Sequence, residues 1–190
     1  MKKLVFLVLI SLLSFEAHAL YTEVGVNYGR KRTSFDADNY LDSESLTGSL
    51  SFYFLERLAL EMSYTSANAI REEKIKSGST VISQQTVYQT TQVYGADLIW
   101  VFADKKAFFQ PYIKGGVAQI RRVQEVKVNS QNTYLLEPEV ATTPSYGLGF
   151  KLAITDTFGI KISYDGWKTP LGGGTFSNDD SVRAGITWML

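Results

Sequence analysis

Apolar and polar residues alternate along most of this chain. Each alternating stretch is about ten residues long and places apolar side chains on one face and polar or small side chains on the other. The stretches lie at residues 20–29, 46–54, 58–65, 93–102, 108–120, 145–154, 158–165 and 181–190. Because a period of two is typical of β-strands, the pattern predicts an all-β fold of eight strands.

The connections between these stretches are alternately short and long. The short ones are residues 55–57, 103–107 and 155–157, and the long, polar ones are residues 30–45, 66–92, 121–143 and 166–180. A soluble barrel would show the same alternation with its apolar faces turned inward, so the connections decide between the two. Short turns on one side and long loops on the other are typical of transmembrane barrels. We therefore predict an eight-stranded antiparallel transmembrane β-barrel with both termini on the periplasmic side.

Aromatic residues gather near the ends of the predicted strands, as in the girdles that such barrels carry at both membrane interfaces. We find no charged residue on the apolar stripes between them. The residues expected in the girdles are Tyr28, Phe54, Tyr64, Tyr94, Trp100, Phe102, Phe109, Tyr146, Phe158, Tyr164 and Trp188.

The last predicted strand, residues 181–190, carries a further signal. The spacing of Gly185, Trp188 and the final Leu190 resembles the closing-strand signal of bacterial outer-membrane β-barrels, a glycine followed by an aromatic and a terminal aromatic residue. The chain departs from this signal at Leu190, where the family usually has Phe. The resemblance implies an assembly signal and, as its partner, the barrel-assembly machinery of the outer membrane.

The first residues have the features of a secretory signal peptide. Lys2 and Lys3 precede an apolar run at residues 4–15, and a small-x-small cleavage site ends at Ala19. We predict a signal peptide at residues 1–19, cleaved after Ala19, and one barrel domain at residues 20–190. An uncleaved membrane anchor is the alternative, although the run is short for a membrane span.

Composition limits the chemistry that the predicted mature chain can perform. It contains no Cys, and the only His, His18, lies in the predicted signal peptide. This excludes Ser-His-Asp and Cys-His catalysis, ordinary zinc sites and disulfides. We therefore expect no enzyme, cofactor or metal. The near-zero net charge gives no sign of nucleic-acid binding.

If the apolar stripes face lipid, the polar stripes face the interior. They carry four acids and four bases, namely Glu23, Glu61, Asp97, Asp165, Lys114, Lys151, Lys161 and Arg183. An eight-stranded barrel is just wide enough for side chains to fill it, so we expect these charges to pair. Our interpretation is a charge-compensated polar core that fixes the strand register. The alternative is a role in conduction or proton relay.

The fold and strand number resemble the small outer-membrane barrels, namely the OmpA transmembrane domain, OmpX and OmpW. This resemblance implies roles in membrane integrity, adhesion, defence evasion or passage of small apolar molecules in a Gram-negative outer membrane. We expect a monomeric structural or surface-interaction protein, with outer-membrane lipid and lipopolysaccharide as surroundings. The alternative is a narrow channel for ions or small hydrophobic solutes, which a gap between Gly95, Gly116 and Gly147 would favour.

Two predicted loop segments, residues 81–92 and 122–128, continue to alternate. We expect them to pair as a sheet above the outer leaflet, whose edge is a candidate for adding a strand from a host or cell-surface ligand. A merely solvated hairpin is the simpler alternative. Arg121 and Arg122 are candidates for contacting lipopolysaccharide phosphates, or else interfacial anchors.

Overall fold

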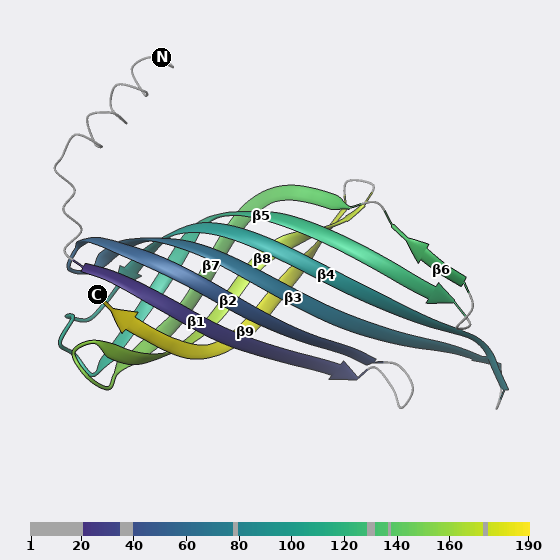
Figure 1. Cartoon of the computed structure of the whole chain (residues 1–190), viewed down its shortest axis with the longest axis horizontal. Coiled ribbons are helices and arrows are strands. Elements are labelled where there is room, and N and C mark those ends of the chain that lie inside the picture. The colour runs from purple at the N-terminus through teal and green to yellow at the C-terminus, as the bar shows by residue number, and fades with distance from the viewer. Residues whose placement is uncertain (1–20, 35–39, 78–79, 129–131, 137, 173–174) are drawn as a thin grey trace, which may run out of the picture.

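The chain forms a closed sheet of antiparallel strands in the computed structural model (Figure 1). The structure describes residues 21–34, 40–77, 80–128, 132–136, 138–172 and 175–190. The predicted signal peptide lies outside the described residues. Within these ranges, no helix has the length and apolar composition needed to cross a membrane. The strands are β1 (Tyr21–Ser34), β2 (Tyr40–Leu55), β3 (Leu58–Ser77), β4 (Thr80–Val101), β5 (Phe109–Val128), β6 (Asn132–Leu135), β7 (Glu139–Ala153), β8 (Phe158–Gly172) and β9 (Thr175–Met189).

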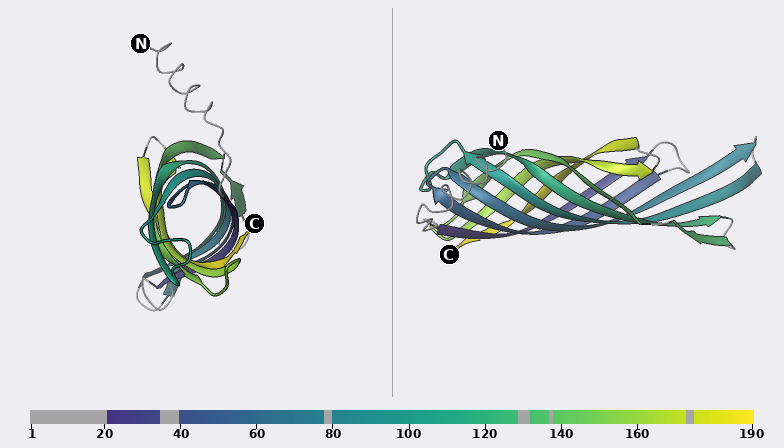
Figure 2. Two further views of the ribbon diagram at one scale, coloured as in Figure 1. Left: turned by 90° about the vertical axis from the view of Figure 1, so that its left-hand side faces the viewer. Right: turned by 90° about the horizontal axis from the view of Figure 1, so that it is seen from above.

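Pairing of the first strand with the last closes the sheet into a barrel. β1 pairs with β2 along one edge and with β9 along the other, for example at Val26↔Ile186. The ring contains every strand except β6, which confirms the predicted eight-stranded antiparallel barrel (Figure 2). We call the end with the β2–β3, β4–β5 and β7–β8 connections the turn end, and the opposite end the hairpin end.

β6 adds to one hairpin instead of to the ring. It pairs with residues 125–128 of β5, beyond the segment of β5 that pairs with β7. Because β4 occupies the other edge of β5, β6 and β7 follow one another along the same edge. Pro138 lies between them and has no N–H to donate to the ladder.

The strands extend far past the predicted segments at the hairpin end. β3 and β4 pair out to Ser77↔Thr80, although residues 66–92 were predicted to be a loop. The loop prediction was wrong for residues 66–77, whereas pairing of residues 81–92 was expected; the predicted loops 30–45, 121–143 and 166–180 are likewise mostly strand. Apolar alternation is lost along residues 66–77, which lie past the lipid-facing part of β3, while backbone pairing with β4 continues.

The pleat of the strands turns the polar stripes inward and the apolar stripes outward. On β1, Val24 and Val26 are exposed on the outer surface, whereas Glu23 and Asn27 are buried. This matches the predicted assignment of faces, because successive side chains of a strand point to opposite sides.

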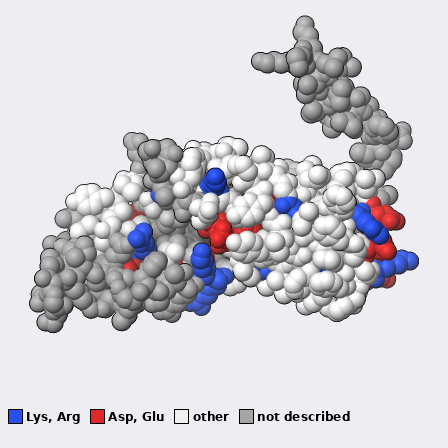
Figure 3. Space-filling model, turned by 180° about the vertical axis from the view of Figure 1, so that it is seen from behind, with Lys and Arg blue, Asp and Glu red and all other residues white. Residues whose placement is uncertain are grey.

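Aromatic rings lie on the outer surface at two levels. Tyr64 and Tyr94 contact each other toward the hairpin end, with ring centroids 5.0 Å apart. Trp100 and Phe102 stack 6.0 Å apart toward the turn end. The surface seen in Figure 3 has a broad uncharged area between the charged residues of the turn end and those farther along the barrel. The outer surface therefore carries an apolar belt with aromatic borders.

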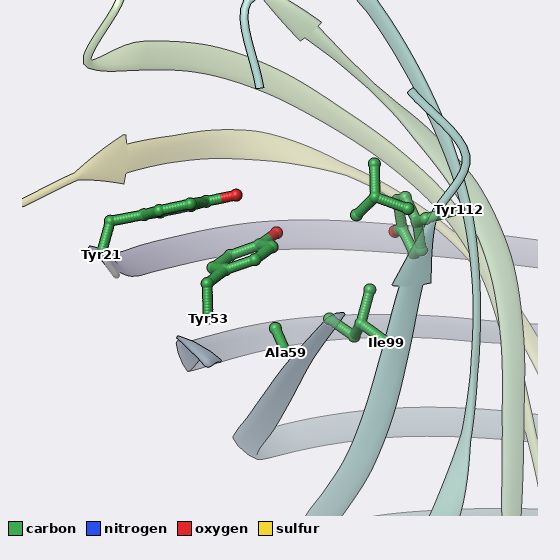
Figure 4. Packing of buried hydrophobic residues seen from close by; sticks show 6 residues of the cluster. Tyr21, Tyr53, Ala59, Ile99 and Tyr112 are labelled. Atoms are coloured by element: carbon green, nitrogen blue, oxygen red, sulfur yellow. The ribbon is translucent and has the colours of Figure 1, made fainter. Parts of the chain in front are cut away.

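The interior also contains two apolar layers. Near the turn end, the buried cluster consists of Tyr21, Tyr53, Ala59, Ile99, Val101 and Tyr112 (Figure 4). Tyr21 and Tyr53 stack there with ring centroids 4.1 Å apart. Nearer the hairpin end, the second cluster consists of Val93, Ala118, Ile120 and Trp167. Asp97 of β4 lies between Val93 and Ile99 along the strand, so a charged layer separates the two apolar layers.

Candidate functional site

Six of the charged residues of the interior form a connected network centred on Lys114 of β5. Its Nζ lies 2.9 Å from Glu61 Oε1, 2.9 Å from Asp165 Oδ1 and 3.4 Å from Asp97 Oδ2. These acids come from β3, β8 and β4, so one lysine links side chains across the lumen. Among the described residues, no group of carboxylates, histidines or cysteines is arranged to hold a metal ion.

Toward the turn end, Lys161 continues this network and Lys151 forms a separate ion pair. Lys161 Nζ lies 2.7 Å from Glu61 Oε2, and Lys151 Nζ lies 2.6 Å from Glu23 Oε2. Lys151 also donates a hydrogen bond to the Tyr53 hydroxyl at 2.8 Å. The tyrosine belongs to the buried cluster at the turn end, so charged and apolar layers are joined.

Arg183 of β9 continues the network toward the hairpin end. Its Nη1 lies 3.3 Å from Asp165 Oδ2, to which Ser163 also donates a hydrogen bond at 2.8 Å. The structure thus brings all eight predicted lumen charges into one interior, where their side chains are at most 8% exposed. Charges buried to this degree persist only when they are paired, because their desolvation is costly.

A glycine makes room for the centre of the network. Gly147 of β7 pairs with Lys114 on one side and with Asp165 on the other. A Cβ at Gly147 would lie 2.7 Å from Asp165 Oδ1 and 2.9 Å from Lys114 Cε. Only a residue without a side chain therefore permits this ion pair to form across β7.

Sequence reasoning missed the serines that support the carboxylates. Ser51 donates a hydrogen bond to Glu61 at 3.4 Å, and Ser145 donates one to Asp97. Both serines were on the predicted polar stripes. Serines recur along these stripes, so the sequence carried no signal that would single out these two.

The gap that would favour a channel is filled. It was expected between Gly95, Gly116 and Gly147. A Cβ at Gly95 would lie 2.5 Å from Ser63 Oγ, and one at Gly116 would lie 2.7 Å from Asp97 Oδ1. A space of about 20 Å³, room for about one water, lies beside Gly95, Asp97 and Lys114. The described side chains therefore close the middle of the barrel.

Beyond the second apolar layer the interior opens into a cavity of about 610 Å³ at the hairpin end, which we call the vestibule. Trp167 and Arg183 lie at its floor, where the lumen narrows. In its wall, Thr169 Oγ1 donates a hydrogen bond to Asp179 Oδ2 at 3.2 Å. Burial raises the pKa of the Asp179 carboxyl above its usual value. The vestibule is thus a cavity that has polar groups at its floor and opens at the hairpin end.

A family model described as outer membrane protein beta-barrel domain matches residues 5–189. The chain belongs to this family. A search of curated proteins finds no match. As an outer-membrane barrel of bacteria, the protein faces the periplasm with its turn end and the outside of the cell with its hairpin end. The apolar belt then faces lipid.

Solved structures of other outer-membrane barrels share the fold. The N-terminal β-barrel domain of Pseudomonas aeruginosa OprF superposes with a TM-score of 0.55 at 15% identity, covering 89% of this chain and 97% of that one. Ail, the attachment invasion locus protein of Yersinia pestis, gives a TM-score of 0.50 at 14% identity, covering 90% and 98%. At these identities the likeness concerns the fold alone.

The outer-membrane barrel carries a raised sheet made of the extracellular parts of β3, β4 and β5 together with β6. The predicted pairing of the two alternating loop segments is confirmed, for example at Val87↔Val126. Neither segment is an edge, however, because Val87 also pairs with Arg71 and Val126 with Tyr134. The expected edge was therefore misplaced, and β6 is the outer strand of the raised sheet beside β5. The hairpin of β3 and β4 extends farthest past the barrel (Figure 2).

Arg122 does not have the position expected of a lipopolysaccharide contact. It is 6% exposed, lines the vestibule and lies 3.4 Å from Glu139 Oε2. It also donates a hydrogen bond to Gln124 Oε1 at 3.1 Å. Alternation along β5 turns Arg122 inward and leaves its neighbour Arg121 exposed outside.

Proposed function

We propose that this outer-membrane barrel is a non-enzymatic structural and surface-interaction protein, and that its raised sheet binds a partner at the cell surface. The observation that carries this proposal is the outer edge of β6, since within the described ranges β6 pairs with β5 alone. Exposed strand edges are ready to pair with a strand from another chain.

The side chains of this edge also favour an interaction. Tyr134 and Leu135 of β6 are 55% and 72% exposed, and Leu136 is 46% exposed. Three consecutive large apolar side chains exposed beyond the membrane favour contact with a partner. Ail, a barrel of the same fold, is named for attachment, so this fold is compatible with such a role.

The closed interior supports a structural role over the channel alternative. Lys114 and its three carboxylates fill the lumen, and the Tyr21–Tyr53 stack lies below them. The predicted mature chain also lacks His and Cys, which removes the usual nucleophile and base pairs of enzymes.

The direction of the backbone amides allows a sharp test. Leu136 N–H donates to the Gln124 carbonyl, so the alternate amides of Thr133 and Leu135 point away from β5. Leu135→Pro removes an outward donor and leaves the β5–β6 ladder in place. Leu135→Ala is the matched control, since it shortens the side chain and keeps the donor.

The measurement is retention of bacteria that display each variant in the outer membrane, both on epithelial monolayers and on non-displaying bacteria. We expect wild type and Leu135→Ala to be retained and Leu135→Pro to be lost at equal surface levels. Equal retention of Leu135→Pro and wild type would contradict binding through the β6 edge.

A further inference from the structure

Two residues at the floor of the vestibule carry buried hydrogen-bond donors that have no acceptor in the described part of the chain. Arg183 and Trp167 are 4% and 7% exposed, and both line the vestibule. Arg183 Nε and Nη2 and Trp167 Nε1 have no hydrogen-bond partner among the described residues. A buried donor left unpaired costs about 1–3 kcal/mol, so an acceptor from outside the protein is expected here.

The guanidinium of Arg183 is held in a fixed orientation. Its Nη1 lies 3.3 Å from Asp165 Oδ2, and its Cζ lies 4.9 Å from the centroid of the Trp167 ring. These contacts leave Nε and Nη2, which share one edge of the guanidinium. Two parallel donors on one edge match the two oxygens of a carboxylate.

The charges around the floor favour an anion with a single negative charge. The charged residues that line the vestibule are Lys31, Arg71, Arg122, Arg183, Asp179 and Asp180. Bases outnumber acids in this lining, even with Glu139 beside Arg122 counted, and the excess attracts an anion. However, Asp165 contacts Arg183 directly, and Asp179 pairs with Trp167 across the β8–β9 ladder. These two acids would repel a second negative charge at the same place.

The walls above the floor suit an apolar body. Leu41, Val87, Val126 and Leu136 line the vestibule. Its volume of about 610 Å³ falls within the range of about 300–1,000 Å³ that is usual for small-molecule sites.

From this juxtaposition we propose that the vestibule binds small organic monocarboxylates from outside the cell. The carboxylate accepts hydrogen bonds from the free edge of Arg183 and from the Trp167 indole N–H, and the apolar body lies against the vestibule walls. The site is distinct from the outward backbone edge of β6, although Leu136, which follows β6, also lines the vestibule wall.

The test is a titration of the refolded barrel in lipid nanodiscs, followed by NMR through the indole ¹⁵N–H signal of Trp167. The probe is benzoate, with benzamide as the neutral analogue and phenyl phosphate as the dianion. We expect benzoate to shift the signal saturably, benzamide to leave it unmoved, and phenyl phosphate to bind at least about tenfold more weakly.

Two variants make the titration specific. Arg183→Lys keeps a positive charge beside Asp165 but loses the two-donor edge, and should weaken benzoate binding by about tenfold or more. Arg121→Lys is the matched control, because Arg121 is exposed on the outer surface and should leave binding unchanged. Heat-resistant gel mobility checks that both variants are folded.

Three results would overturn the proposal. One is a Trp167 signal that benzoate does not move in the folded wild type, which would assign the free donors to internal water in the small space beside Arg183. Another is an equal shift with benzamide, which would mean apolar partitioning only. The third is benzoate binding of unchanged strength in Arg183→Lys.

Discussion

The charged layer and the vestibule are built on the same strands but serve different purposes. In the charged layer, Lys114 has three carboxylates within 3.4 Å, and the space left beside them holds about one water. In the vestibule, about 610 Å³ stays open and Arg183 keeps an edge of unpaired donors. One barrel interior is thus divided into a part whose charges are paired and closely packed and a part that has room for a ligand.

Side-chain length accounts for this difference. In the charged layer, the long side chain of Lys114 extends over Gly147 and reaches acids on other strands. In the vestibule, the inward positions of β2 and β3 carry short side chains such as Ser43, Ser45, Ala67 and Ala69. An eight-stranded barrel has little interior room, so small residues decide where space remains.

Removing Lys114, the central cation of the charged layer, should have the largest effect on the stability of the barrel. Lys114→Met leaves Glu61, Asp97 and Asp165 buried without their shared partner, so we expect a loss of about 3–5 kcal/mol in the free energy of unfolding. The measurement is urea unfolding in detergent or lipid, together with heat resistance of the folded gel band.

A lysine outside the barrel supplies the control. Lys127 lies 3.5 Å from Glu125, but both side chains are more than 40% exposed. Lys127→Met should therefore change the free energy of unfolding by no more than about 1 kcal/mol. Unchanged heat resistance of Lys114→Met would show that the charged layer is not the stabilising region.

Filling the space at a glycine should have an intermediate effect. Gly147→Ala places a Cβ within 3 Å of both Asp165 and Lys114, and overpacking of this kind costs about 1–3 kcal/mol. Gly48→Ala is the matched control, because a Cβ at Gly48 meets nothing within 4 Å. Urea unfolding of the two variants should separate them, and equal stability would mean that the charged layer can expand.

Substituting Asp179 in the wall of the vestibule should have the smallest effect on stability. Burial raises the folded-state pKa of Asp179 above its unfolded value, so folding favours the protonated carboxyl. This contribution is present at acidic pH below the unfolded pKa and is lost as pH rises through the folded pKa. Asp179→Asn should therefore gain stability over wild type at neutral pH and lose that gain in acid. If the urea midpoints of wild type and Asp179→Asn changed equally across this pH range, burial of a charged Asp179 would be excluded.

The sequence predicts the barrel well wherever one face of a strand meets lipid. Leu98 and Trp100 alternate with Asp97 and Ile99, and this alternation places each side chain correctly. It fails beyond the membrane in residues 66–77, because lipid no longer covers the outer face of the strand there. The sequence also misassigned Arg122, because the predicted strand ended at residue 120 and the side of the sheet that Arg122 faces was therefore not predicted.

The identity of the lumen charges follows from the sequence, but their connections do not. The polar stripes of β5 and β3 predict that Lys114 and Glu61 point inward. Which acids surround Lys114 depends on strand tilt and stagger, and these follow from the closure of the whole sheet. The apolar layers show the same limit, because Tyr53 and Tyr112 stand on stripes that read as polar.

Conductance of the refolded protein in a planar lipid bilayer tests the closed interior most directly. If Lys114 and its partners fill the lumen above the Tyr21–Tyr53 stack, the membrane should stay silent while the protein is inserted and folded. Discrete, reproducible current steps from the folded protein would contradict the account, because they require a continuous water path through the charged layer.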